Sequence, residues 1–237
     1  MAFADEWIVL DSGSRDQTVD LARSLGAKVH SSPDWPGFGP QKNRALDLAS
    51  CDWAFSIDAD EWVSAELAAA IKAALRAPTH EAYWVNRRSR FCGKLIHYGD
   101  WGGDRVLRLF RRKSARFTDD LVHERVQAPL PHGQLEGYLW HDSVEDLADG
   151  RAKMLRYAKL GAMKIRNRRG GPSVLAMPGV RGLWTFVRGY LLRGGFLDGP
   201  EGWHIARLNA RGTYLRYLWS RHTEAEVERL AELESAA

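Results

Sequence analysis

The sequence lacks the features that mark secreted, disulfide-stabilised or membrane-spanning proteins. Only two cysteines are present, Cys51 and Cys92, and they form neither a disulfide framework nor a metal-ligand spacing, so we expect reduced thiols in a cytosolic protein. The first six residues contain neither the basic segment nor the apolar core of a signal peptide. No apolar run approaches the roughly 18 residues that would cross a bilayer, so we expect no membrane span.

Internal repeats, low-complexity tracts and the common nucleic-acid-binding motifs are absent as well. The sequence contains no helix-turn-helix, zinc-finger or aromatic ribonucleoprotein signature. It is nevertheless basic, with a formal net charge of +4, and its arginines and lysines cluster in residues 87–90, 105–116 and 151–169. Such clusters favour anionic partners, which include nucleotide phosphates, phosphorylated glycans, anionic lipids and nucleic acids.

The first third of the chain alternates between strand and helix patterns. Apolar runs predict strands over 6–11, 28–30 and 53–58, and helical spacing predicts helices over 18–25, 41–50 and 64–76. Ser14 with Gln17 fits a capping box for the first helix, and Ser64 is a good N-cap for the third. This order is typical of α/β proteins and predicts a mostly parallel sheet with covered faces.

The pattern changes after Pro78. Strand patterns cover 82–86, 105–110 and 121–126, and a flexible loop is expected over 98–104. From Val144 onward the spacing is helical, with a break at 170–172 and an amphipathic helix over 223–235. We therefore predict an α/β domain over residues 1–142 and a helical region over residues 143–237.

Two carboxylates, Asp58 and Asp60, lie one residue apart where the strand over 53–58 should end. Ligands of α/β sheets bind at the carboxyl ends of strands, and side chains two residues apart on an extended backbone point to the same side. Two carboxylates on one side are suitable ligands for Mg²⁺ or Mn²⁺, which prefer carboxylates and substrate phosphates. The alternative interpretation is a solvated acidic turn before a helix.

Further motifs occur in an order that resembles a known family. The run Asp11-Ser12-Gly13-Ser14-x-Asp16 precedes Asp58-Ala59-Asp60, and Tyr98-Gly99-Asp100-Trp101, residues 104–112 and Val122-His123-Glu124 follow. This order is similar to that of inverting family 2 glycosyltransferases with the nucleotide-sugar-binding GT-A fold. The later runs and the glycine-rich segment 194–202 resemble the lipopolysaccharide inner-core β-1,4-glucosyltransferase branch. The resemblance implies an α/β protein with a Rossmann-like mixed sheet and a helical C-terminal region.

The resemblance also implies which residues bind the donor. Asp11 would bind the donor base, and the following nucleotide-side turn and helix start would contribute Ser14, Asp16, Lys42, Asn43 and Arg44. Simpler interpretations stay open for several of them. Asp11 could merely end a strand, Asp16 could be an N-cap, and Lys42 could be a helix surface residue.

The remaining implied roles concern metal and catalysis. Asp58 would touch the ribose or the metal, Asp60 would bind a divalent Mg or Mn ion, and Glu124 would be the catalytic base. Transfer to a hydroxyl needs a base at the acceptor oxygen, and a metal at the diphosphate offsets the charge that develops on the leaving group. Glu124 could instead form a structural salt bridge with Arg105 or Arg125.

The implied reaction is transfer of a hexose, glucose, from a UDP-sugar to a lipopolysaccharide-core acceptor or a related glycan or lipid. Candidates for the acceptor side are Asp100, Trp101, Asp104, Arg105 and His123. Two other interpretations remain, a nucleic-acid-binding protein that uses the basic clusters and an inactive scaffold at the membrane. The resemblance to transferases favours an enzyme that needs no nucleic acid.

Residues 174–219 mix aliphatic and aromatic side chains with arginines, and no part is long enough to cross a bilayer. This mixture suits a helix in the headgroup region, with packing on the catalytic domain as the alternative. We therefore expect a cytoplasmic protein that is peripheral at the inner face of the bacterial inner membrane.

Members of the family begin with a further strand and helix before the strand matched by Trp7 to Asp11, and neither is present here. The missing strand is normally central in the sheet. We therefore expect either that the start codon is misassigned or that the chain is an N-terminally truncated form, which would expose a strand edge.

Overall fold

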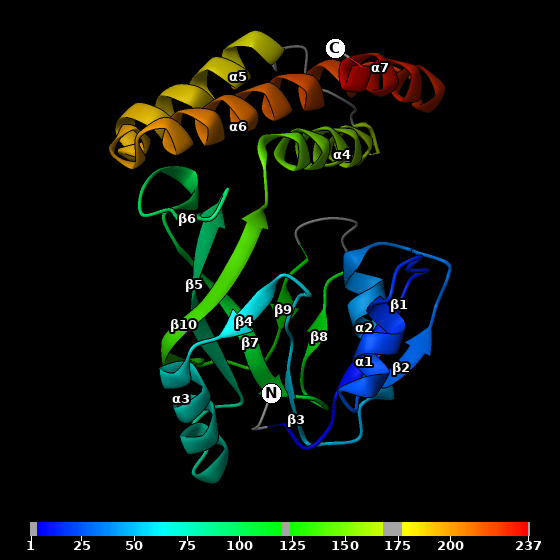
Figure 1. The fold of residues 1–237 in the computed structure, drawn as a ribbon, viewed down its shortest axis with the longest axis vertical. Helices are drawn as coiled ribbons and strands as arrows, with labels where there is room; N and C mark the ends of the chain where they lie inside the picture. The colour runs from blue at the N-terminus through cyan, green and yellow to red at the C-terminus, as the bar shows by residue number, and fades with distance from the viewer. Residues whose placement is uncertain (1–3, 120–123, 168–176, 237) are drawn as a thin grey trace. The chain divides into compact units, whose positions relative to one another are not determined.

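The computed structural model describes residues 4–119, 124–167 and 177–236 (Figure 1). The chain divides into two compact units. The first unit comprises Met1–Asn86 and Arg105–Leu139, and the second comprises Arg87–Asp104 and Trp140–Ala237. The strands β5 (Ala82–Phe91), β7 (Asp104–Arg111) and β10 (Gly133–Val144) carry the chain across this division. Residues 87–104 therefore belong with the C-terminal helices.

The first unit begins with a parallel strand pair, β1 (Ile8–Asp11) and β2 (Lys28–Ser31), connected by α1 (Thr18–Ser24). This strand–helix–strand unit confirms the sequence prediction. The predicted capping box is wrong, because α1 begins four residues after Ser14 and the amide of Thr18 donates to the carboxylate of Asp16 at 3.0 Å. Ser14 is instead held in the turn, where its amide donates to Asp11.

The larger sheet has the strand order β3-β7-β5-β10-β4, with β6 (Lys94–Leu95) paired to β5. Its outer strands are β3 (Trp53–Phe55) and β4 (Glu61–Val63). The pairs β3–β7 and β5–β6 are antiparallel, so the expectation of a mostly parallel sheet is wrong and the protein has a mixed α/β architecture. The long strands after α3 return by turns and loops rather than by helical crossovers, which permits antiparallel pairing.

Two helices cover apolar clusters of the first unit. In α3 (Ala65–Arg76) the buried side chains of Leu67 and Ile71 pack with a cluster from β5, β7 and β10. Its N-cap is Ser64, whose hydroxyl accepts from the amide of Leu67 at 3.1 Å, as the sequence predicts. A second cluster includes Leu46 of α2 (Phe38–Leu48) and the short antiparallel pair β8 (Arg116–Phe117) and β9 (Val126–Gln127).

The second unit consists mainly of helices, which Figure 1 colours from yellow-green to red. They are α4 (Leu147–Arg166), α5 (Pro178–Phe186), α6 (Pro200–Trp219) and α7 (Glu224–Ala236), with the short helical turns η1 (Gly99–Trp101), η2 (Val187–Leu192) and η3 (Gly195–Asp198). Both α4 and α5 pack against α6. Within the described ranges, none of the helices is long and apolar enough to span a membrane.

The glycine-rich segment after η2 has a structural explanation. A Cβ on Gly202 would lie 1.8 Å from the carbonyl oxygen of Gly195, so α6 and η3 approach closely only because Gly202 lacks a side chain. Asp198 is buried, and its carboxylate accepts from the amides of His97 and Tyr98 at 3.1 and 2.8 Å. The segment therefore fixes the loop before η1.

Candidate functional site

The two aspartates of the acidic pair lie in a turn and not on a strand. β3 ends at Phe55, and the turn before β4 is closed by the amide of Glu61, which donates to the Asp58 carbonyl at 3.1 Å. The expectation that an extended backbone carries both side chains is therefore wrong. Asp58 is half-buried, whereas Asp60 is exposed.

The turn is anchored by a buried ion pair. The side chain of Glu61 is fully buried, and its two carboxylate oxygens lie 2.6 and 2.8 Å from a terminal nitrogen of Arg108 on β7. Glu61 also accepts from the amide of Asp58 at 3.0 Å. Two buried charges are stable only when paired and well hydrogen-bonded, so this pair fixes the position of the turn.

Asp58 joins this pair to a second cation. Its Oδ2 atom accepts from Arg108 at 2.8 Å, and its Oδ1 atom lies 2.9 Å from Nζ of Lys42 on α2. Burial would raise the pKa of Asp58, but the charges of Arg108 and Lys42 outweigh that effect and hold the pKa well below its usual range. Asp58 is therefore a carboxylate at neutral pH.

Lys42 also forms an ion pair with Glu124, the residue predicted to be the catalytic base. Its Nζ atom lies 2.7 Å from Oε1 of Glu124, whose side chain is 14% exposed, and it lies 5.7 Å above the ring of Phe117. Asp58 and Glu124 are 66 positions apart in the sequence but contact the same ammonium group. Glu124 thus forms its ion pair with Lys42. Among the described residues, it forms no ion pair with Arg105 or Arg125.

This arrangement has a defined chemical capacity. A lysine between two carboxylates can reorient toward an incoming anion, because its side chain is flexible and its charge is compact. Such a change would leave Glu124 free to accept a proton. The site thus combines a cation that can attract phosphate with a carboxylate that can accept a proton. Lys42 stands on α2, and Glu124 lies two residues before β9.

Asp11, which is predicted to bind the nucleotide base of the donor, is the last residue of β1, and Ser14 and Asp16 follow it before α1. The carboxylate of Asp11 accepts from the amides of Gly13 and Ser14 at 3.0 and 3.1 Å, and hydrogen bonds from these residues lower its pKa. Gln41 of α2 donates to the hydroxyl of Ser12 at 2.8 Å, which ties this turn to the helix that carries Lys42.

Asn43 and Arg44 connect α2 to neighbouring segments of the first unit. The amide of Asn43 exchanges two hydrogen bonds of 2.9 Å with the backbone of Phe117. Arg44 binds the carboxylate of Asp34 at 2.8 Å and the hydroxyl of Ser32 at 2.9 Å. Among the three neighbours predicted for the nucleotide side, Lys42 is the one with ion pairs to Asp58 and Glu124.

The acceptor-side candidates are not brought together in one cluster by the contacts of the described residues. In the second unit, Asp100 pairs with Arg188 and Arg193 at 3.0 and 2.8 Å. Trp101 packs edge-on against Phe91. Asp104 forms a two-pronged pair with Arg87 at 3.1 and 2.8 Å. Arg105 belongs to the first unit and is exposed, and His123 lies outside the described residues.

The sequence reasoning did not assign roles to Glu61 and Arg108. A signal for both was present, because Glu61 follows the acidic pair directly and Arg108 interrupts the apolar run of β7. A charged residue inside a buried strand requires a partner of opposite charge. In the described part of the chain, no group of three or more histidine, cysteine or acidic residues is arranged to hold a metal by itself.

Comparison with known proteins gives consistent similarities. Residues 3–127 match the model of glycosyl transferase family 2. An uncharacterized glycosyltransferase of Rickettsia bellii (strain RML369-C) is 28% identical over 228 residues, which cover 90% of this chain and 76% of that protein. The lipopolysaccharide core biosynthesis glycosyltransferase LpsC of Rhizobium meliloti (strain 1021) is 29% identical over 231 residues, which cover 90% of this chain and 83% of that protein. A solved structure, S. aureus TarS 1-349, aligns over 91% of this chain and 82% of that chain, with 14% identity and a TM-score of 0.39.

Proposed function

Because the chain belongs to glycosyl transferase family 2, we propose that it moves a hexose, glucose, from a UDP-sugar to a lipopolysaccharide-core acceptor or a related glycan or lipid, with inversion. The observation that carries this proposal is the position of Lys42 between Asp58 and Glu124. The similarity to a transferase named for lipopolysaccharide core biosynthesis supports the choice of acceptor class.

In the proposed reaction Glu124 is the general base. Its carboxylate takes the proton from the acceptor hydroxyl while that oxygen attacks the anomeric carbon and the bond to the diphosphate breaks. Direct displacement of this kind inverts the configuration and needs no second carboxylate as nucleophile. Lys42 attracts the phosphates of the donor, and Asp11 binds the donor base from the end of β1.

A divalent metal fits the acidic turn by the chemistry of its ligands. Asp58 and Asp60 offer hard carboxylate oxygens, and Asp60 is exposed to solvent. Each oxygen of Asp58 already accepts from a cation but keeps a second lone pair. Two carboxylates together with substrate phosphates are a common ligand set for Mg²⁺ or Mn²⁺. When bound, the ion would offset negative charge on the leaving diphosphate.

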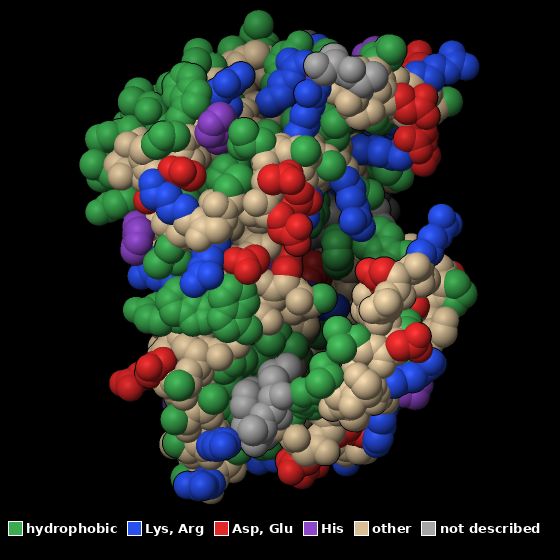
Figure 2. All heavy atoms as spheres, in the orientation of Figure 1, with side chains coloured by type: hydrophobic (Ala, Val, Ile, Leu, Met, Phe, Trp, Pro, Cys, Tyr) green, Lys and Arg blue, Asp and Glu red, His purple; other side chains and the backbone are tan. Residues whose placement is uncertain are grey.

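The proposed partner on the acceptor side is a membrane surface. Apolar side chains gather over the helices of the second unit (Figure 2), and several large ones are exposed, including Leu183, Trp184, Leu191 and Leu192. Arginines at 181, 188 and 193 alternate with them in the sequence. Exposed apolar and basic groups on one helical segment suit the headgroup region of an anionic membrane.

The direct test is a thermal-shift panel of nucleotide sugars with and without Mn²⁺. We expect UDP-glucose to raise the melting temperature most, and Mn²⁺ to increase that shift. Asp60→Asn should remove the Mn²⁺-dependent part, because an amide is a weaker ligand for a hard cation, and the exposed control Asp20→Asn should behave like the wild type. A protein that binds no nucleotide sugar under any condition would instead support a membrane-bound scaffold without catalysis.

A further inference from the structure

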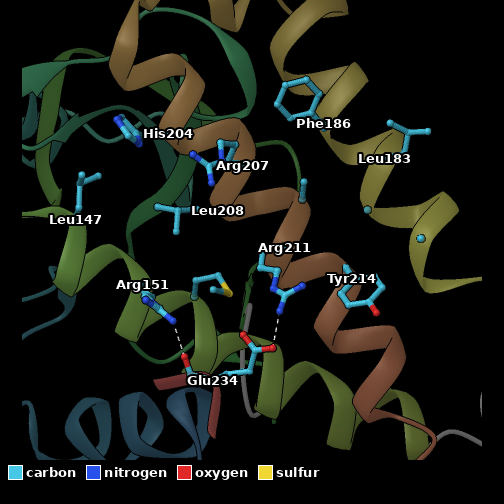
Figure 3. A pocket seen from close by; sticks show the side chains of 14 residues that line it. Leu147, Arg151, Leu183, Phe186, His204, Arg207, Leu208, Arg211, Tyr214 and Glu234 are labelled. Carbon is cyan, nitrogen blue, oxygen red and sulfur yellow. Dashed lines mark hydrogen bonds and ion pairs between the residues drawn. The ribbon is translucent and has the colours of Figure 1, made fainter. Parts of the chain in front are cut away.

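The second unit contains a cavity of about 710 Å³ that is lined by residues of this unit alone (Figure 3). All four of its long helices contribute to the lining, with α4 on one side, α5 on the other and α6 between them. The volume is within the range of small-molecule sites, which is roughly 300–1,000 Å³.

One part of the lining is apolar. Leu147 and Met154 of α4, Leu183 and Phe186 of α5, and Leu208 of α6 face the cavity. Leu147 and Leu183 are 47% and 65% exposed, so the apolar lining continues to the surface of the unit. A hydrocarbon chain would gain by burial here, whereas a sugar would find few hydrogen-bond partners on these side chains.

The other part of the lining is cationic. Arg151 of α4 and Arg207 and Arg211 of α6 line the cavity, and the single carboxylate among the lining residues is that of Glu234 on α7. No carboxylate of the described residues pairs with Arg207, whose guanidinium lies 5.9 Å from the ring of Trp203. The cavity therefore has an excess of positive charge next to its apolar wall.

Glu234 already makes the contacts with arginines that an anionic ligand would make in this cavity. Its carboxylate pairs with Arg211, and its carbonyl oxygen accepts from a terminal nitrogen of Arg151 at 2.6 Å (Figure 3). One residue of the last helix thus holds two of the three arginines. A phosphate group could bind the same guanidinium groups with two-pronged hydrogen bonds, for which arginine geometry is well suited.

We infer that this cavity binds the phosphate-bearing headgroup of an anionic phospholipid, with the upper part of an acyl chain against the apolar wall. The ligand must be both anionic and apolar, because three arginines and five apolar side chains line the same space. The inference deepens the proposed membrane partner and rests on it, and it assigns to Glu234 the role of an internal competitor of the lipid phosphate.

The experiment is a calorimetric titration of the full chain with dihexanoyl-phosphatidate below its micelle concentration. Inorganic phosphate and dihexanoyl-phosphatidylcholine are titrated in parallel. We expect phosphatidate to bind and the other two to bind much more weakly. Equal binding of inorganic phosphate would show a simple anion site, equal binding of phosphatidylcholine would show an apolar site without charge selection, and no binding at all would contradict the inference.

Three variants make the test specific. Arg207→Gln should weaken phosphatidate binding by roughly tenfold, since a hydrogen bond to a charged group is worth about that factor. Glu234→Gln should strengthen it, because the internal competitor is lost. Arg229→Gln removes the same charge from α7 outside the lining and should have no effect. Weaker binding by Glu234→Gln, or equal losses in both arginine variants, would overturn the inference.

The same samples are titrated with UDP-glucose. All variants should keep the nucleotide affinity of the wild type, because the cavity and the Lys42 cluster share no residues. A wild type that binds phosphatidate but no nucleotide would contradict the proposed transferase function and leave the lipid site intact. Melting temperatures of the variants identify any that lose the fold.

Discussion

At the scale of single residues, the charged cluster of the first unit contains two ion pairs that differ in burial. The Glu61–Arg108 pair is its fixed half, and the Lys42–Glu124 pair is its exchangeable half. The side chains of Glu61 and Arg108 are 0% and 7% exposed, so separating them would leave a buried charge without its partner. Lys42 and Glu124 are 19% and 14% exposed and stand nearer to solvent. A ligand can therefore displace Lys42 without disturbing the buried pair that positions Asp58.

The buried Glu61–Arg108 pair leads to a prediction about the free energy of unfolding. Glu61→Gln should lower the free energy of unfolding by about 3 kcal/mol or more, because Arg108 would lose its fully buried counter-charge. The matched control is Glu81→Gln, since Glu81 is 50% exposed and lies 3.9 Å from Arg111. It should cost less than about 1 kcal/mol. Urea unfolding measures both, and equal losses would show that burial of the pair is unimportant.

The lowered pKa of Glu6 leads to a prediction about how the free energy of unfolding changes at acidic pH. Its carboxylate pairs with Lys28 and accepts from the amide of Ser50, and these bonds lower its pKa to about 2. A lowered folded-state pKa stabilises the protein above the unfolded value of 4.5, and that contribution is lost as the pH falls toward 2. Glu6→Gln should therefore flatten the decline of unfolding free energy between these two pH values. The exposed control Glu232→Gln should retain the slope of the wild type, and a Glu6→Gln slope equal to the wild-type slope would contradict the assignment.

At the scale of elements, the close approach of η3 and α6 depends on glycine. Gly202→Ala should destabilise the second unit strongly, because the new Cβ would lie 1.8 Å from a backbone oxygen that cannot move alone. Gly179→Ala on α5 is the matched control, since a Cβ there meets nothing within 4 Å. Alanine favours a helix over glycine by about 1 kcal/mol, so the control should be neutral or stabilising. Thermal unfolding of both variants tests the contrast, which would be absent if the helices can separate at no cost.

The sequence predicted elements well where local signals were strong. Hydrophobic spacing and the Ser64 cap located α3, and the first strand–helix–strand unit was found with its parallel pairing. β10 was missed because its Gly133 and Gly137 and its exposed polar residues weaken the strand pattern. Gly137 is required there by α3, since a Cβ would lie 2.3 Å from the amide nitrogen of Leu67. Such a tertiary requirement has no local signal.

The candidate site was predictable in its residue types and less so in its geometry. Asp58, Lys42 and Glu124 were identified by their resemblance to family motifs, and the structure places them in one cluster. The turn that carries Asp58 and the buried Glu61–Arg108 pair could not be predicted, because they depend on which strands become neighbours. Asn43 and Arg44 adjoin Lys42 in sequence, but helical geometry directs them to other partners.

At the scale of the whole molecule, the exposed apolar side chains of α5 provide the prediction about membranes. Trp184 is 52% exposed, whereas Phe186 packs against Tyr190 and Trp203 at ring distances of 5.2 and 5.3 Å. Trp184→Ser should therefore weaken co-sedimentation with anionic vesicles without affecting the fold, and high salt should weaken it further. Leu21→Ser removes an exposed apolar side chain from α1 of the first unit, where Leu21 is 59% exposed, and serves as the control. Wild-type protein that stays in the supernatant at low salt would contradict the membrane proposal.

The most direct test of the proposed transferase mechanism is the turnover of Glu124→Gln. The amide preserves the shape of the side chain but cannot take the acceptor proton, so turnover with UDP-glucose and a lipopolysaccharide-core acceptor should fall by about 10²–10⁴-fold. The dissociation constant of UDP-glucose should stay close to that of the wild type, and the exposed control Glu136→Gln should change neither quantity. A Glu124→Gln variant that keeps its turnover, or that loses donor binding instead, would contradict the role of Glu124 as the base.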